Sequence, residues 1–141
     1  MKQILLLVLG LLIISTQSIA ANKDGKVLAK QSFPDLVVTN IKIDQEHNKI
    51  IYSVKNQGRG IADPSVSSVD ILNDQKMGKS LKNSIPSLPP GRSYTATINY
   101  PVMTKGKYQV KATADYNNFI GESDELNNSN TMSLSIGFKL K

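Results

Sequence analysis

The chain has 141 residues, a formal net charge of +6 and no cysteine. The lack of cysteine excludes disulfides, thiolate nucleophiles and thiolate metal ligands. Lysine and arginine occur singly along the chain, so there is no basic cluster of the kind that binds nucleic acid. We therefore expect neither a disulfide scaffold nor a nucleic-acid-binding protein.

The first 20 residues have the features of a secretory signal peptide. Lys2 supplies a positive charge, residues 4–14 are almost unbroken Leu, Ile and Val, and the small residues Ser18 and Ala20 occupy the positions that a signal peptidase reads. The apolar run is shorter than the about 20 residues that a membrane-spanning helix needs. We predict cleavage after Ala20 and a mature chain that is secreted or periplasmic and not transmembrane. The alternative is an uncleaved anchor.

The rest of the chain is predicted to be one domain between two short polar segments. Residues 21–33 are polar and aperiodic, which indicates a flexible spacer, and residues 139–141 form a basic tail. From residue 34 to residue 138 the apolar side chains recur with a period of two, as they do in half-buried strands. No stretch carries a helical stripe, so the predicted fold class is all-β.

The first predicted strand changes the face on which its apolar residues lie. Leu36 and Val38 share one parity, whereas Ile41 and Ile43 share the other. Because side chains alternate strictly between the two faces of a strand, the switch indicates a bulge near Thr39–Asn40 or a strand that changes sheets.

Six further stretches alternate in the same way, separated by turn residues such as Gly58, Pro64 and the Leu88–Gly91 segment. They are centred on residues 50–54, 69–71, 77–85, 94–100, 108–114 and 132–136. The stretch 77–85 has the weakest pattern and is expected at a sheet edge. Seven strands at this spacing predict a seven-stranded antiparallel β-sandwich with Greek-key connections.

The inward-facing members of these strands form the predicted core. They are Leu36, Val38, Ile41, Tyr52, Val54, Val69, Ile71, Ala96, Ile98, Tyr108, Val110, Ala112, Leu134 and Ile136. Tyr108 stands at the start of the sixth strand, where a tyrosine corner is expected in immunoglobulin-like sandwiches. An ordinary core tyrosine is the equally weighted alternative.

Four short motifs follow one another along the domain. They are Pro34–Val38, Val54–Gly58, Leu88–Gly91 and the polar segment from Asp115 to Asn128. In this order they resemble the CARDB domain family, the "cell adhesion related domain found in bacteria". The resemblance implies an immunoglobulin-like β-sandwich with an extracellular role in adhesion or protein contact, and it implies no chemistry.

The segment from Asp115 to Asn130 is longer than a usual hairpin connection and is rich in side-chain oxygens. Oxygen ligands of this kind suit Ca²⁺, although the spacing is not that of an EF-hand. The candidate ligands are Asp115, Asn117, Glu122, Asp124 and Glu125. The alternative interpretation is that these side chains cap turns and bond to nearby backbone, with Ile120 or Leu126 pinning the loop to the core.

No catalytic or cofactor-binding residue is predicted. His47 is the single histidine and lies in a polar turn, without a second histidine, a cysteine or a nucleophile elbow as a partner. The acids of the long segment are crowded together, whereas a glycosidase needs two carboxyl groups that flank the sugar. We therefore do not expect an enzyme.

The predicted function is an exported, non-catalytic binding or adhesion module for protein–protein contact at the bacterial cell surface or in the periplasm. An edge strand or the long loop is the expected contact surface. The alternative is a carbohydrate-binding module for a cell-surface glycan, which the polar face formed by Ser93, Thr95, Thr97 and Asn99 would serve. The chain has no tryptophan and few other aromatic side chains for sugar stacking. A small exported enzyme is the third and weakest interpretation.

Overall fold

The computed structural model describes residues 31–76, 78–100 and 104–137. The predicted signal peptide, most of the predicted spacer and the basic tail lie outside these residues. Within the described part of the chain, no helix is long and apolar enough to cross a membrane.

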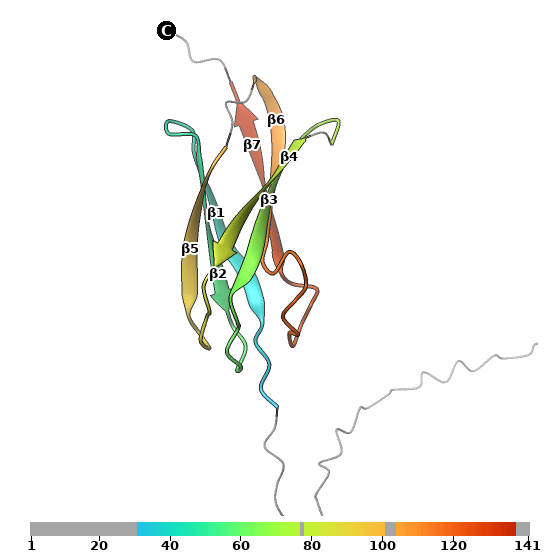
Figure 1. Ribbon diagram of the computed structural model, residues 1–141. Helices are drawn as coiled ribbons and strands as arrows, with labels where there is room; N and C mark the ends of the chain where they lie inside the picture. The colour runs from blue at the N-terminus through green and yellow to red at the C-terminus, as the bar shows by residue number, and fades with distance from the viewer. Residues whose placement is uncertain (1–30, 77, 101–103, 138–141) are drawn as a thin grey trace, which may run out of the picture. The chain divides into compact units, whose positions relative to one another are not determined.

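The described residues form seven strands and no helix (Figure 1). The strands are β1 (Leu36–Asp44), β2 (Lys49–Asn56), β3 (Ser65–Asn73), β4 (Gly78–Ile85), β5 (Ser93–Asn99), β6 (Gly106–Thr113) and β7 (Ser129–Ile136). One sheet has the order β1-β2-β5 and the other has the order β4-β3-β6-β7, with every neighbouring pair antiparallel. The chain therefore changes sheets between β2 and β3, between β4 and β5, and between β5 and β6, which confirms the predicted sandwich.

The predicted bulge lies in β1. Val38 pairs with Val54 and Asn40 pairs with Ser53, so the register of β1 against β2 shifts by one residue at Thr39. The shift returns Ile41 and Ile43 to the inner face of the sheet, where both pack against the core. The parity switch in the sequence was therefore a bulge, and β1 stays in one sheet.

The core lies between the two sheets and contains the predicted residues. Ten of them are buried: Leu36, Val38, Tyr52, Val54, Val69, Ile71, Ala96, Val110, Ala112 and Leu134. The other four, Ile41, Ile98, Tyr108 and Ile136, are partly buried and pack against this cluster. The prediction omitted Ile50, Ile85, Tyr100 and Ala114, which end up buried, and also Ala62 and Leu88.

Ala62 and Leu88 are buried outside the named strands. They form an isolated antiparallel bridge, in which Ala62 N donates to Leu88 O at 3.0 Å and Leu88 N donates to Ala62 O at 2.9 Å. Periodicity does not predict this contact, because it joins two connections between strands rather than two strands.

Tyr108 makes a tyrosine corner. Its Oη donates to the backbone carbonyl of Thr104 at 2.9 Å, four residues upstream, while its ring packs against the core. This bond fixes the start of β6, and it decides between the two interpretations of Tyr108 in favour of the corner.

Val54 tests the placement of the core. A Val54→Asp substitution puts an unpaired carboxylate at a fully buried position, so we expect a loss of about 4 kcal/mol or more, or of folding altogether. The matched control is Lys55→Asp, one residue along on the other face of β2, which should cost less than about 1 kcal/mol. Urea titration followed by circular dichroism measures both. Equal midpoints for the two variants would contradict the placement.

Candidate functional site

The two ends of the sandwich differ in their exposed side chains. We call "the loop end" the end at which β1, β3, β5 and β7 begin, formed by residues 31–35, 57–64, 86–94 and 114–128 (Figure 1). All large apolar side chains that are exposed among the described residues lie there. They are Phe33, Ile61, Tyr94, Tyr116, Phe119 and Leu126. The described residues of the opposite end expose none.

The side chain of Asn56 holds the loop end together. Asn56 is the last residue of β2 and is fully buried. Its Oδ1 accepts hydrogen bonds from the backbone N–H groups of Asp35 (3.1 Å) and Gly58 (3.0 Å). Its Nδ2 donates to the carbonyl groups of Gly60 (2.8 Å) and Leu88 (2.7 Å). One amide therefore joins the start of β1, the β2–β3 connection and the β4–β5 connection.

The β2–β3 connection wraps closely around the residues that precede β1. Arg59 N and Gly60 N both donate to Phe33 O, at 3.0 Å and 2.9 Å. A Cβ atom at position 58 would lie 2.5 Å from Asp35 N, and one at position 60 would lie 2.4 Å from Ser32 O. Only glycine allows this approach, so the two glycines are required for backbone contact rather than for a turn alone.

Asn56 gives a sharp stability test. Asn56→Ala leaves the N–H groups of Asp35 and Gly58 and the carbonyl group of Gly60 without their side-chain partner, so we expect a loss of about 3 kcal/mol or more. Its neighbour Gln57 is exposed and makes one side-chain bond, to Asp35 Oδ2 at 3.2 Å, so Gln57→Ala should cost less than about 1 kcal/mol. Thermal unfolding of both variants measures the difference. A small loss for Asn56→Ala would show that the amide is not the central link.

The β6–β7 loop is fastened to the start of β1 through Glu122. The Glu122 carboxylate accepts hydrogen bonds from Leu36 N and from Asn128 Nδ2, the latter at 2.6 Å. The next residue, Ser123, donates its N–H to Pro34 O at 2.9 Å. Burial raises the pKa of the Glu122 carboxyl above its ordinary value, although the hydrogen bonds from Leu36 and Asn128 oppose this shift.

The acids at the tip of the loop bond to nearby backbone. Asp124 Oδ1 accepts from Leu126 N at 2.9 Å, and Glu125 Oε1 accepts from Glu122 N at 2.8 Å. Both side chains are exposed. The turn-capping interpretation therefore accounts for these two members of the predicted calcium set.

The other predicted ligands lie in different surroundings. Asp115 is buried and accepts from Ile120 N at 2.8 Å through Oδ2, Glu122 is half-buried, and Asn117 is exposed. No group of three or more acidic, histidine or cysteine side chains in the described part of the chain is arranged to hold a metal ion. The five-residue calcium set thus stays a prediction. Ile120 packs against the core as expected, whereas Leu126 points into solvent.

Both edges of the three-stranded sheet carry a side-chain clamp from the other sheet. Asn83 of β4 donates through Nδ2 to Thr97 O on β5, and Asn130 of β7 donates through Nδ2 to Val38 O on β1, each at 3.3 Å. Each of these bonds takes one of the two lone pairs of an edge carbonyl group, so an added strand would share that acceptor. Edge pairing of this sheet is therefore weakened at one carbonyl group on each edge.

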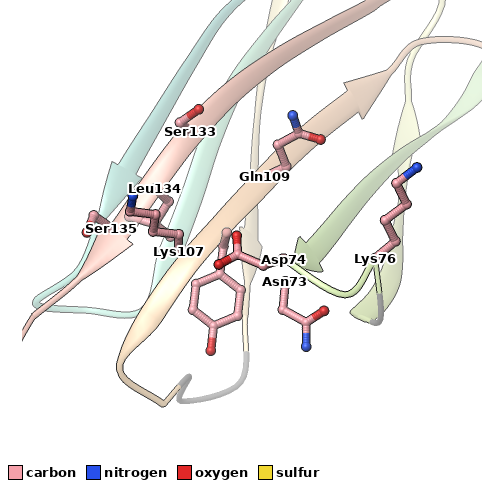
Figure 2. A pocket seen from close by; sticks show the side chains of 9 residues that line it. Asn73, Asp74, Lys76, Lys107, Gln109, Ser133, Leu134 and Ser135 are labelled. Carbon is pink, nitrogen blue, oxygen red and sulfur yellow. The ribbon is translucent and has the colours of Figure 1, made fainter.

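The opposite end holds a shallow depression. It has a volume of about 560 Å³ and lies over the outer face of β6 and β7 and the β3–β4 turn (Figure 2). Its charged lining residues are Lys76, Lys107 and Asp74, with Gln109, Ser133 and Ser135 beside them. His47, also at this end, is exposed and contacts Asp44 Oδ2 at 2.8 Å through Nδ1. Its backbone bond to Asp44 lowers the pKa of that carboxyl.

The strand order and the tyrosine corner define an immunoglobulin-like β-sandwich. The CARDB family model matches residues 33–132, which is most of the chain. The chain therefore belongs to the CARDB family, and the resemblance noted in the sequence is confirmed.

Solved structures agree with this assignment. The CARDB domain of a Pyrococcus furiosus protein, described in complex with di-metal ions, is 27% identical, with a TM-score of 0.54 over 75% of this chain and 96% of that one. A domain of a Methanosarcina acetivorans protein is 21% identical, with a TM-score of 0.58 over 73% of this chain and 91% of that one. That second likeness shows the fold alone. No curated protein matches the chain.

A partial likeness to an enzyme carries no activity. β-Glucosidase 3B from Thermotoga neapolitana is 17% identical, with a TM-score of 0.51 over 73% of this chain, but the match covers 16% of the enzyme. At this identity the likeness shows a shared sandwich fold and nothing about hydrolysis.

Sequence reasoning missed the two features that shape the loop end. The sequence marks Asn56 only as a polar residue where the second strand ends before Gly58, because polar residues beside glycine usually form turns. The exposure of Phe119 was also missed, since an isolated apolar residue in a polar segment is normally an anchor. The Asn-Gln-Gly motif shared with the family was the available signal for Asn56.

Proposed function

We propose that this protein is an exported, non-catalytic adhesion module that binds a protein partner through its loop end. The observation that carries the proposal is the position of the large exposed apolar side chains of the described residues, which lie at that end, with Phe119 84% exposed and Leu126 94% exposed. Clustered apolar exposure of this kind marks interaction surfaces in soluble proteins. Membership of an adhesion-related family supports the same role.

The loop end is a better contact surface than the edges of the three-stranded sheet. The clamps of Asn83 and Asn130 occupy edge carbonyl groups, whereas the backbone of the loop end is held by Asn56 and Glu122. A fixed backbone that presents exposed side chains loses little conformational entropy on binding. This arrangement, loops positioned by a rigid sandwich, is the one through which such folds usually bind.

The charge of the loop specifies the chemistry of the partner. Residues 114–128 contain four acids and no lysine or arginine. Two of the acids, Asp124 and Glu125, directly precede Leu126 and are exposed. The complementary protein surface has an apolar centre that receives Phe119 and Leu126, and a rim of lysine or arginine.

Two exposed side chains test this surface without disturbing the fold. The double variant Phe119→Ser, Leu126→Ser should lower the affinity of labelled residues 21–141 for envelope fractions at least tenfold, because apolar anchors dominate interface energy. Its melting temperature should stay within about 2 °C of the parent. The control is Thr95→Ala, Thr97→Ala on the outer face of β5, which should bind as the parent does.

Pretreatment of the envelope fraction identifies the class of partner. Protease digestion should abolish saturable binding, whereas periodate oxidation of glycans should leave it intact. The reverse result would replace the protein partner with the carbohydrate alternative. Unchanged binding of the Phe119, Leu126 variant would reject the loop end as the contact surface.

Export is tested by the mature N-terminus. If the signal peptide is cleaved after Ala20, protein recovered from the periplasm or medium should have the intact mass of residues 21–141. An Ala20→Arg variant should accumulate uncleaved, because the peptidase requires a small residue there. Recovery of the full 141-residue chain in the membrane fraction would favour the uncleaved anchor instead.

A further inference from the structure

Three oxygen atoms at the base of the β6–β7 loop are buried without a hydrogen-bond partner. They are Asp115 Oδ1, Asn127 Oδ1 and Asn128 Oδ1. Asp115 is 4% exposed and Asn128 is 8% exposed. The other two such atoms in the described part of the chain are serine hydroxyls of β3. Each unpartnered buried oxygen costs about 1–3 kcal/mol, so three within one loop indicate a missing partner.

The ladder of β6 and β7 brings these residues to one place. Its last pair is Thr113 with Ser129, and the bond from Ala114 N to Asn128 O (2.9 Å) extends the contact. Asp115 therefore lies across from Asn127 and Asn128. Its positive φ of 39° turns the chain, and its Oδ2 accepts from Ile120 N inside the loop. Because this bond fixes the carboxylate, it also fixes the position of Asp115 Oδ1, which has no hydrogen-bond partner.

Neighbouring carboxylates fix the orientation of both amides. Asn128 Nδ2 donates to Glu122 Oε1 at 2.6 Å, and Asn127 Nδ2 donates to Asp35 Oδ1 at 2.9 Å. A carboxylate only accepts hydrogen bonds, so each NH₂ group must face it and each amide oxygen must face away. The amide oxygens of Asn127 and Asn128 therefore have a fixed orientation and no hydrogen-bond partner.

The charged side chains of the loop itself are negative, and the Lys82 ammonium of β4 lies 4.5 Å from the centroid of the Tyr116 ring. Asp35, Asp115 and Glu122 all contribute to this region, and residues 114–128 supply no positive side chain. The missing partner of the three oxygens is therefore expected to be a cation rather than a hydrogen-bond donor alone.

We propose that Asp115 Oδ1, Asn127 Oδ1 and Asn128 Oδ1 are direct ligands of a Ca²⁺ ion that organises the β6–β7 loop. Ca²⁺ accepts six to eight oxygen ligands in irregular geometry, so water or backbone oxygens complete the shell. With one carboxylate among the direct ligands, the dissociation constant is expected on the order of 10⁻⁴–10⁻³ M, as in extracellular modules. Glu122 and Asp35 are positioning residues, which hold the amides.

This ligand set differs from the one that the sequence predicts. Asp115 is common to both, but Asp124 and Glu125 bond to backbone at the loop tip and are not ligands. The two sets can be separated by experiment, because they predict opposite effects for substitutions at position 127 and at positions 124–125.

Calcium binding is measured on the mature chain, residues 21–141, by two independent readouts. Addition of 10 mM CaCl₂ after EDTA treatment should raise the melting temperature by roughly 5 °C. TbCl₃ should give luminescence sensitised by Tyr116, which directly follows Asp115, and CaCl₂ should displace it. No melting shift and no displaceable luminescence in the parent chain would overturn the proposal.

Variants assign the ligands. Asp115→Asn removes the direct charge and should abolish the calcium response, and Asn127→Ala should weaken it at least tenfold. The control Asp124→Asn, Glu125→Gln removes two acids from the same loop and should keep the full response. Loss of the response in the control with retention in Asp115→Asn would overturn the assignment. If Asp115→Asn does not fold, Asn127→Ala decides the comparison with the control.

The Phe119→Ser, Leu126→Ser variant separates this inference from the proposed protein contact. It should bind Ca²⁺ as the parent does, because neither side chain contributes a ligand. If the parent chain responds to Ca²⁺ but shows no saturable binding to the envelope fraction, the proposed protein contact is wrong; if it binds the envelope fraction but gives no calcium response, this inference is wrong.

Discussion

The buried amide of Asn56 is the interaction on which the loop end depends. Its four side-chain bonds join three segments, which are also linked by the backbone bonds to Phe33 O and by the Ala62–Leu88 bridge. A buried carboxamide is stable only when it is fully bonded, so the segments must reach it together or not at all. The backbone of Asn56 adds to the link, because its N–H donates to Arg92 O and its carbonyl accepts from Gly91 N. This residue sets the geometry from which the other loops are positioned.

The residues just before β1 carry this constraint across the loop end. Asp35 receives the amide of Asn127 on Oδ1, while its own N–H is held by Asn56. Pro34 O accepts from Ser123 N, and Leu36 N donates to Glu122. One short segment thus connects the β2–β3 connection on one side with the β6–β7 loop on the other. A substitution of Asn56 is therefore expected to affect the β6–β7 loop as well. The effect would pass through the hydrogen bonds of the residues before β1 and not through the two sheets.

The sequence predicted the sandwich well because strands have a local signature. Alternation located all seven strands, the parity switch located the bulge at Thr39, and the position of Tyr108 suggested the corner. The loop end was predicted poorly because its contacts are long-range. Glu122 bonds to Leu36 from 86 positions away and Asn127 bonds to Asp35 from 92 positions away. No period in the sequence signals such pairs, so each acid could equally cap a turn, bond to distant backbone or ligate a cation.

The loop end combines two features that rarely coincide in a connection between strands. Several of its backbone N–H groups are bonded to carbonyl groups, among them those of Tyr116 and Ser123, yet Phe119 and Leu126 are almost fully exposed. Flexibility does not explain this exposure, because the residues on either side are held by Asp115, Glu122 and Glu125. A loop that only closed the sandwich would turn these apolar side chains inward, where burial of each is worth about 1.5–3 kcal/mol. Because Phe119 and Leu126 point into solvent, the folded chain lacks that stabilisation. Binding of a partner that buries both side chains would supply it.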